Sequence, residues 1–144
     1  MIAGKTPWVS ALVGLVVVVS LAMVAHWARR DPGTGCALDG MKIDPVYRVE
    51  VVDGGGGRHA FCCPTCARLW LKQQPIPPAT ITVTDEASGE ATDAATAHYV
   101  RSPVVTTPST GNRIHVFRSR DDAEKHANTF GGIVLPESEY PFRP

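Results

Sequence analysis

The sequence predicts an α+β protein, in which an N-terminal transmembrane helix precedes two small ββαβ lobes related by an internal repeat. Three observations support this prediction. Residues 6–28 form an apolar run long enough to cross a bilayer, and later segments alternate apolar and polar residues as half-buried strands do. The motif His-Ala-Phe at 59–61 also recurs as His-Val-Phe at 115–117, each time at the end of an expected strand.

The composition excludes some partners and limits the size of the core. The chain has 144 residues, with 14 basic and 14 acidic side chains, and its isoelectric point lies near 7.0. This balance gives no reason to expect nucleic acid as a partner. The 13 glycines and 12 prolines indicate a turn-rich domain whose small core depends on metal or disulfide ties.

The N-terminal residues 1–30 are predicted to anchor the chain in a membrane. Residues 6–28 contain no Asp, Glu, Lys or Arg, and Trp8 and Trp27 bracket the run. A helix between the two tryptophans would span about 30 Å, the thickness of a hydrocarbon core. No small-x-small cleavage site follows the run, which favours a single-pass anchor over a cleaved signal peptide. The flanking basic residues are nearly balanced and leave the orientation open.

The first lobe, residues 31–78, is expected to be a ββα unit rich in cysteine. Residues 46–52 alternate as a strand, four glycines turn the chain, and residues 58–62 return as the partner strand. Pro64 then suits the first turn of a helix that extends to about Gln73 and buries Leu69 and Trp70.

The second lobe, residues 79–136, is expected to begin with a strand shared between the lobes. The remaining expected segments are a strand at 79–84, a surface connection at 85–96, an extended stretch at 97–105, a turn at 108–112, strands at 113–117 and 133–135, and a proline-rich tail at 137–144. Ser119 with Asp122 predicts a helix start, and Ala123, Ala127 and Phe130 share one face of that helix.

The repeat restricts metal chemistry to the first lobe. At an offset of 56 residues, Cys62, Cys63 and Cys66 correspond to an arginine, a serine and an aspartate, so the second lobe has no matching thiols. Cys62 and Cys66 bracket a strand-to-helix turn, while Cys63 and Cys66 form a C-x-x-C motif. Because Cys62 and Cys63 are adjacent in an extended strand, only one of them is expected to meet a metal together with Cys66.

The remaining candidate ligands lie across the hairpin, in the segment 36–41. Cys36 begins a knuckle in which Asp39 occupies the second ligand position, and Met41 adds a thioether. Thiolates with a thioether favour Cu(I), with Zn(II) as the alternative, and Asp39 weakens the signal for structural zinc because a carboxylate is a poorer partner for a soft ion. A disulfide from Cys36 to a later cysteine and a purely structural zinc site are further interpretations.

The sequence shows no pattern of an enzyme. It contains no arrangement of nucleophile, base and orienting residue, and the glycines at 54–57 lack the Lys-Ser/Thr ending of a phosphate loop. A thiol–disulfide carrier using Cys63 and Cys66 is one alternative, although the βαβ context of thioredoxin-like proteins is missing. His59 and His115 are expected to be structural or solvent-facing rather than metal-bound.

Two stretches resemble known families. The sequence C-A-L-D-G-M at 36–41, followed by a hairpin and F-C-C-P-T-C at 61–66, resembles the treble-clef-like metal modules called TRASH domains. Residues 81–100 and 116–135, the second with a helix that ends in Gly-Gly-x-Val, are similar to the NosL family of nitrous oxide reductase accessory proteins. The resemblance covers residues 36–135.

The resemblance implies a membrane-attached, periplasmic protein of two ββαβ lobes that binds Cu(I) and supplies it to an acceptor copper enzyme such as nitrous oxide reductase. The family's C-x-x-C-G-M knuckle maps onto residues 36–41, with Asp39 in place of its second cysteine. On this interpretation Cys36, Cys62 and Cys66 hold the ion, and Met41 or Cys63 is the exchangeable fourth ligand.

Overall fold

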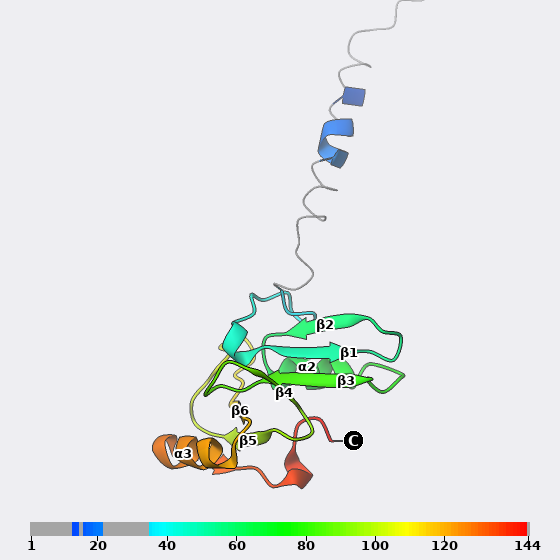
Figure 1. Ribbon diagram of the computed structural model, residues 1–144. Helices are drawn as coiled ribbons and strands as arrows, with labels where there is room; N and C mark the ends of the chain where they lie inside the picture. The colour runs from blue at the N-terminus through cyan, green and yellow to red at the C-terminus, as the bar shows by residue number, and fades with distance from the viewer. Residues whose placement is uncertain (1–12, 15, 22–34, 144) are drawn as a thin grey trace, which may run out of the picture. The chain divides into compact units, whose positions relative to one another are not determined.

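The computed structural model describes residues 13–14, 16–21 and 35–143, and the chain divides into two compact units, Met1–Asp31 and Pro32–Pro144 (Figure 1). In the first unit the described residues are helical and exposed. Most of the expected transmembrane segment, residues 6–28, lies outside the described residues.

The expectation of a transmembrane helix is corrected by the part of the chain that the structure describes. None of the helices there is both long enough and apolar enough to cross a membrane. The described residues therefore do not support the predicted single-pass membrane localisation.

The second unit confirms the α+β class. It contains a four-stranded sheet in the order β2-β1-β3-β4 and a three-stranded sheet in the order β6-β5-β7, with all pairs antiparallel. The elements are η1 Pro45–Tyr47, β1 Val49–Val52, β2 Arg58–Phe61, α2 Pro64–Leu71, β3 Thr80–Thr84, β4 Ala91–Asp93, β5 His98–Arg101, β6 Ile114–Phe117, α3 Arg120–Phe130, β7 Ile133–Val134 and η2 Glu137–Glu139.

The two halves share one topology. In each, the first strand lies between the second and third strands of a ββαβ unit, β1 between β2 and β3 and β5 between β6 and β7. Ala67 in α2 and Ala123 in α3, which are 56 residues apart, are both fully buried. Cys63 and Ser119, separated by the same offset, are both N-caps whose side chains accept a backbone N–H three residues on. The cysteine at 63 therefore does what a serine does in the second half.

Helix α2 begins as predicted but buries a different face. Pro64 occupies the first turn, and the helix packs on β1 and β2. Its buried residues are Pro64, Cys66 and Ala67, whereas Leu69 is 42% exposed. Leu69 is two residues from Ala67, a rotation of about 200° that turns it away from the sheet. Trp70 is half-buried and packs against the hairpin.

Helix α3 covers the second sheet and is capped at both ends. Ser119 Oγ accepts the N–H of Asp122, and Gly131 ends the helix in the left-handed conformation with φ of 69°. Ala123 and Ala127 are buried, but Phe130 is 50% exposed because it is the last helical residue before the chain turns.

One main core joins the two sheets. Tyr99 of β5 is fully buried, donates its hydroxyl to the carbonyl of Ala94 over 2.7 Å, and packs edge-on against Tyr140 and Phe142 from the C-terminal segment.

The strand β4 at Ala91–Asp93 was not expected within the polar connection 85–96. Because β4 pairs with β3, it forms an edge strand of the first sheet.

The β1–β2 turn is held by a carboxylate. Asp53 Oδ1 accepts the N–H groups of Gly55 and Gly57 over 2.8 and 2.9 Å, and Oδ2 lies 2.8 Å from His59 Nε2. These contacts lower the pKa of Asp53 below its usual value, and the hydrogen bond with His59 has the largest effect. The ring of His59 packs at a tilt against that of Trp70 of α2, with centroids 4.4 Å apart, so the turn is connected to the helix that carries Cys66.

We expect Asp53 to add a pH-dependent component to stability. Its pKa is lower in the folded state, so its contribution is present above the unfolded value of about 3.9 and is lost as the pH falls through the folded value. The Asp53→Asn variant should therefore lose stability relative to the native chain at pH 6, and the difference should shrink at pH 3. Urea unfolding at a series of pH values measures this. Asp121→Asn, at an exposed position on α3, is the control, and an equal change in both variants would contradict the prediction.

Candidate metal centre

The segment 35–42 forms a tight knuckle at the edge of the first sheet. Gly35 and Lys42 form an isolated bridge, and the N–H of Cys36 donates to the carbonyl of Met41 over 2.8 Å. Within the loop, the N–H of Gly40 donates back to the carbonyl of Cys36, also over 2.8 Å. Gly40 has φ of +72°, a conformation that other residues rarely adopt. The knuckle fixes the side chain of Cys36 toward the protein interior.

Asp39 is held by the same knuckle with one oxygen directed at the thiols. Its Oδ1 accepts the N–H of Met41 over 3.1 Å, and the Cys66 thiol donates to Oδ2 over 3.6 Å. Partial burial raises the pKa of this carboxyl, but the hydrogen bonds from Met41, Cys36 and Cys66 outweigh that effect and lower the pKa below its usual value. Asp39 is therefore a charged group beside three thiols.

Two further thiols come from the junction between β2 and α2. Cys62 follows the last residue of β2, and Cys66 lies in the first turn of α2, with their sulfur atoms 3.4 Å apart. Burial raises the pKa of Cys62 to about 12, and the neighbouring Cys63 makes a smaller contribution in the same direction. Burial also raises the pKa of Cys66. Both side chains are therefore neutral thiols in the metal-free protein at neutral pH. No disulfide connects the described cysteines, all four of which are free.

These residues converge on one point. One ligand atom from each of Cys36, Asp39, Cys62 and Cys66 lies within 4.8 Å of the other three, and within the described ranges this is the one such group of metal-ligating side chains. The three cysteines are 3%, 3% and 0% exposed, and Asp39 is exposed. A tetrahedral centre with metal–sulfur bonds of about 2.3 Å needs ligand atoms about 3.8 Å apart. The donor set therefore fits a soft or borderline ion without a large rearrangement.

The structure separates the predicted ligands into two sets. Cys36, Asp39, Cys62 and Cys66 are brought together, whereas Cys63 is not part of this group of cysteine and carboxylate side chains. The sulfur of Cys63 accepts the N–H of Cys66 over 3.5 Å as the N-cap of α2 and lies 3.9 Å from the sulfur of Cys62. The side chain of Met41 is 49% exposed, and its backbone serves the knuckle.

A loop from the second half supports the start of α2. The hydroxyl of Thr107 donates to the carbonyl of Cys62 over 3.4 Å, and the hydroxyl of Thr65 donates to Asn112 Oδ1 over 2.7 Å. Thr110 Oγ1 also lies 3.5 Å from the sulfur of Cys63. These residues were not predicted, because they are 45 to 47 positions from their partners and carry no ligand chemistry.

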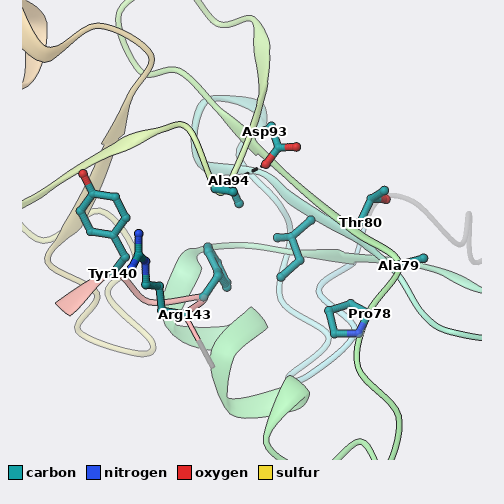
Figure 2. A pocket seen from close by; sticks show the side chains of 10 residues that line it. Pro78, Ala79, Thr80, Asp93, Ala94, Tyr140 and Arg143 are labelled. Atoms are coloured by element: carbon teal, nitrogen blue, oxygen red, sulfur yellow. Dashed lines mark hydrogen bonds between the residues drawn. The ribbon is translucent and has the colours of Figure 1, made fainter. Parts of the chain in front are cut away.

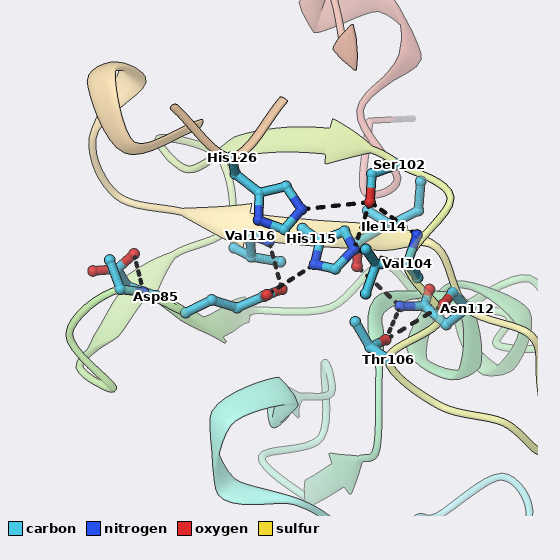
Figure 3. Close-up of polar contacts among 11 residues, drawn as sticks. Asp85, Ser102, Val104, Thr106, Asn112, Ile114, His115, Val116 and His126 are labelled. Atoms are coloured by element: carbon cyan, nitrogen blue, oxygen red, sulfur yellow. Dashed lines mark hydrogen bonds and ion pairs between the residues drawn. The ribbon is translucent and has the colours of Figure 1, made fainter. Parts of the chain in front are cut away.

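A second polar cluster is buried under α3 and has a structural arrangement. His115 Nδ1 lies 2.9 Å from Glu86 Oε2, and Nε2 lies 3.0 Å from Ser102 Oγ. Figure 3 shows the ring of His126 beside that of His115, and its Nε2 lies 3.4 Å from the same hydroxyl. Glu86 Oε1 accepts the N–H of Val116 over 3.0 Å. Both nitrogens of His115 are occupied, which agrees with a structural histidine.

A cavity of about 610 Å³ lies at the other edge of the first sheet, between residues 78–81, 93–95 and 140–143 (Figure 2). Its charged groups already have partners, because Asp93 Oδ1 accepts the N–H of Ala95 over 2.7 Å and Arg143 pairs with Glu137. No cysteine or histidine lines it. This cavity therefore adds no cysteine or histidine ligand to the candidate metal centre.

Comparison with known proteins identifies the fold. No family model matches the chain, and no curated protein matches it significantly in sequence. Among solved structures, the copper chaperone NosL from Shewanella denitrificans superposes with a TM-score of 0.64 at 21% identity, over 76% of this chain and 90% of that protein. At this identity the match establishes the architecture: this chain has the fold of the NosL copper chaperone, as its resemblance to that family implied.

Proposed function

We propose that the chain is a metal chaperone that binds Cu(I) and passes it to an acceptor copper enzyme, with nitrous oxide reductase as the leading candidate. The observation that carries the proposal is the convergence of three buried cysteines and Asp39 within 4.8 Å. The fold shared with a copper chaperone supports it. Cys36, Cys62 and Cys66 are the proposed ligands, and Asp39 is the proposed fourth ligand.

The chemistry of the donor set suits reversible binding of a soft ion. Three thiolates satisfy Cu(I), and burial of Cys36, Cys62 and Cys66 keeps water from the bound ion. A site of this kind releases its ion by ligand exchange, in which donors of the acceptor replace the thiolates one at a time. No redox step is required, because the ion keeps its oxidation state throughout.

A structural zinc module is the second candidate, and Asp39 is the observation that favours it. Three thiolates and one carboxylate complete the tetrahedral shell that Zn(II) prefers, and structural zinc sites contribute directly to folding. The third alternative, a thiol–disulfide carrier, has less support. Cys63 and Cys66 are both fully buried, whereas a reactive thiol pair needs an exposed thiolate.

A metal titration separates these candidates. The full chain, purified without oxygen, is titrated with Cu(I) against a competing chelator, and with Zn(II) in parallel. We expect one tightly bound Cu(I) per chain, and weaker binding in the Cys36→Ser variant. Zinc that persists through purification, together with unfolding on chelation, would instead indicate the structural module. A reversible disulfide without metal affinity would indicate the carrier.

A further inference from the structure

We infer that Asp39 is the ligand at which the bound ion is exchanged, and that the acceptor approaches this face with a sulfur donor. The inference rests on the proposed function, and it adds where transfer begins and what chemistry the partner must present. Among the four converging groups, Asp39 is the exposed one, while the three cysteines are buried. An incoming ligand therefore meets the ion on the side of the carboxylate.

The carboxylate is placed for this role by the knuckle. Its Oδ1 is occupied by the N–H of Met41, which leaves Oδ2 on the side of the Cys66 sulfur. Oδ2 can therefore bind the ion and leave it while Oδ1 keeps the loop in place. The exposed thioether of Met41 belongs to the same knuckle and offers the partner a flexible apolar contact.

The chemistry identifies the kind of group that takes the place of Asp39. A carboxylate oxygen is a hard donor and is the weakest of the four partners for a soft ion, so its bond breaks first. A thiolate or thioether of the acceptor forms the new bond, and the ion keeps its oxidation state. If the incoming group is a thiol, its proton passes to solvent. The carboxylate of Asp39 returns to its contacts within the knuckle.

Three variants test the inference. Asp39→Asn keeps an oxygen that can accept the N–H of Met41 but removes the anionic ligand, and Asp39→Cys replaces it with a sulfur that binds a soft ion more tightly. The matched control is Asp44→Asn. Asp44 also accepts the N–H of the residue two positions on, over the same 3.1 Å, but caps the short helix η1.

The measurement is the rate at which the Cu(I)-loaded full chain transfers its ion to a synthetic Cys-x-x-Cys peptide in stopped flow, with equilibrium affinity measured separately. We expect transfer at least tenfold faster from Asp39→Asn and at least tenfold slower from Asp39→Cys, with Asp44→Asn at the native rate. Circular dichroism of each variant checks that the fold is kept.

The outcomes distinguish this inference from the proposed function. If the native chain binds Cu(I) but both Asp39 variants transfer at the rate of Asp44→Asn, the exchange role is wrong and the chaperone proposal stands. Faster transfer from Asp39→Cys than from the native chain would also overturn it. If the native chain binds no Cu(I), the proposed function fails and the inference fails with it.

Discussion

Replacing Cys66 by serine is expected to weaken metal binding by two to three orders of magnitude. The binding free energy of a four-ligand zinc site is roughly 10–16 kcal/mol, or about 2.5–4 kcal/mol for each ligand, and each 1.4 kcal/mol corresponds to about a factor of ten in affinity. Cys66 is fully buried and lies within 3.4 Å of the Cys62 sulfur and 3.6 Å of Asp39 Oδ2, so its sulfur is central to the group. Competition with a chromophoric chelator measures the loss for Cu(I) and Zn(II).

The control for this experiment is Cys63→Ser, because the two cysteines belong to the same C-x-x-C motif but have different positions in the structure. Cys63 is the N-cap of α2, and serine is among the preferred residues at that position. Ser119 caps α3 in the equivalent place. We expect Cys63→Ser to bind metal as the native chain does. An equal loss in both variants would show that Cys63 is a ligand and would contradict the assigned group.

Replacing Phe61 by alanine is expected to lower the free energy of unfolding by about 3–5 kcal/mol, the usual cost of removing a fully buried phenylalanine. Phe61 is 0% exposed at the end of β2, directly before Cys62, and its ring lies 5.4 Å from that of Trp70. The free energy of unfolding of a domain of this size is roughly 5–15 kcal/mol in total, so the variant should be partly unfolded near physiological temperature. Urea denaturation followed by circular dichroism gives the difference.

The same substitution at Phe130 is the matched control. Phe130 is half exposed at the end of α3 and contacts the ring of His126, with centroids 4.7 Å apart. Its replacement by alanine should cost less than about 1 kcal/mol. If Phe61→Ala cost no more than Phe130→Ala, the main core would not depend on the ring of Phe61.

The regular elements were predictable where local chemistry determines them. Alternation identified β1, although the strand begins only at Val49, because Asp44 caps a short 3₁₀ turn that contains Pro45. Pro64 and Ser119 marked the starts of both helices, since each position has a specific backbone requirement. Local chemistry placed Ala123 and Ala127 on the buried face of α3, but it could not determine the face that α2 buries, because that depends on the sheet beneath it. Leu69 was therefore misplaced.

The sequence predicted which types of residue form the candidate site, but it could not determine which of the candidate residues belong to it. Spacing alone identified the cysteines, yet it could not choose between Cys62 and Cys63. That choice depends on which sulfur caps the helix. Asp39 was the less obvious candidate beside Met41, since sulfur is the softer donor. The structure brings Asp39 into the group because Met41 uses its N–H to orient the carboxylate.

The loop that supports α2 has a consequence for how the protein is made. Thr107 and Asn112 hold the start of the metal-site helix from positions 45 and 47 residues downstream. As the polypeptide leaves the ribosome, the cysteines emerge well before this loop has been synthesised. Contacts at such separation form late, after the entropy of closing a long segment has been overcome. The cysteines are therefore synthesised before the loop that supports their helix, and the complete surroundings of the site form only once residue 112 has been added.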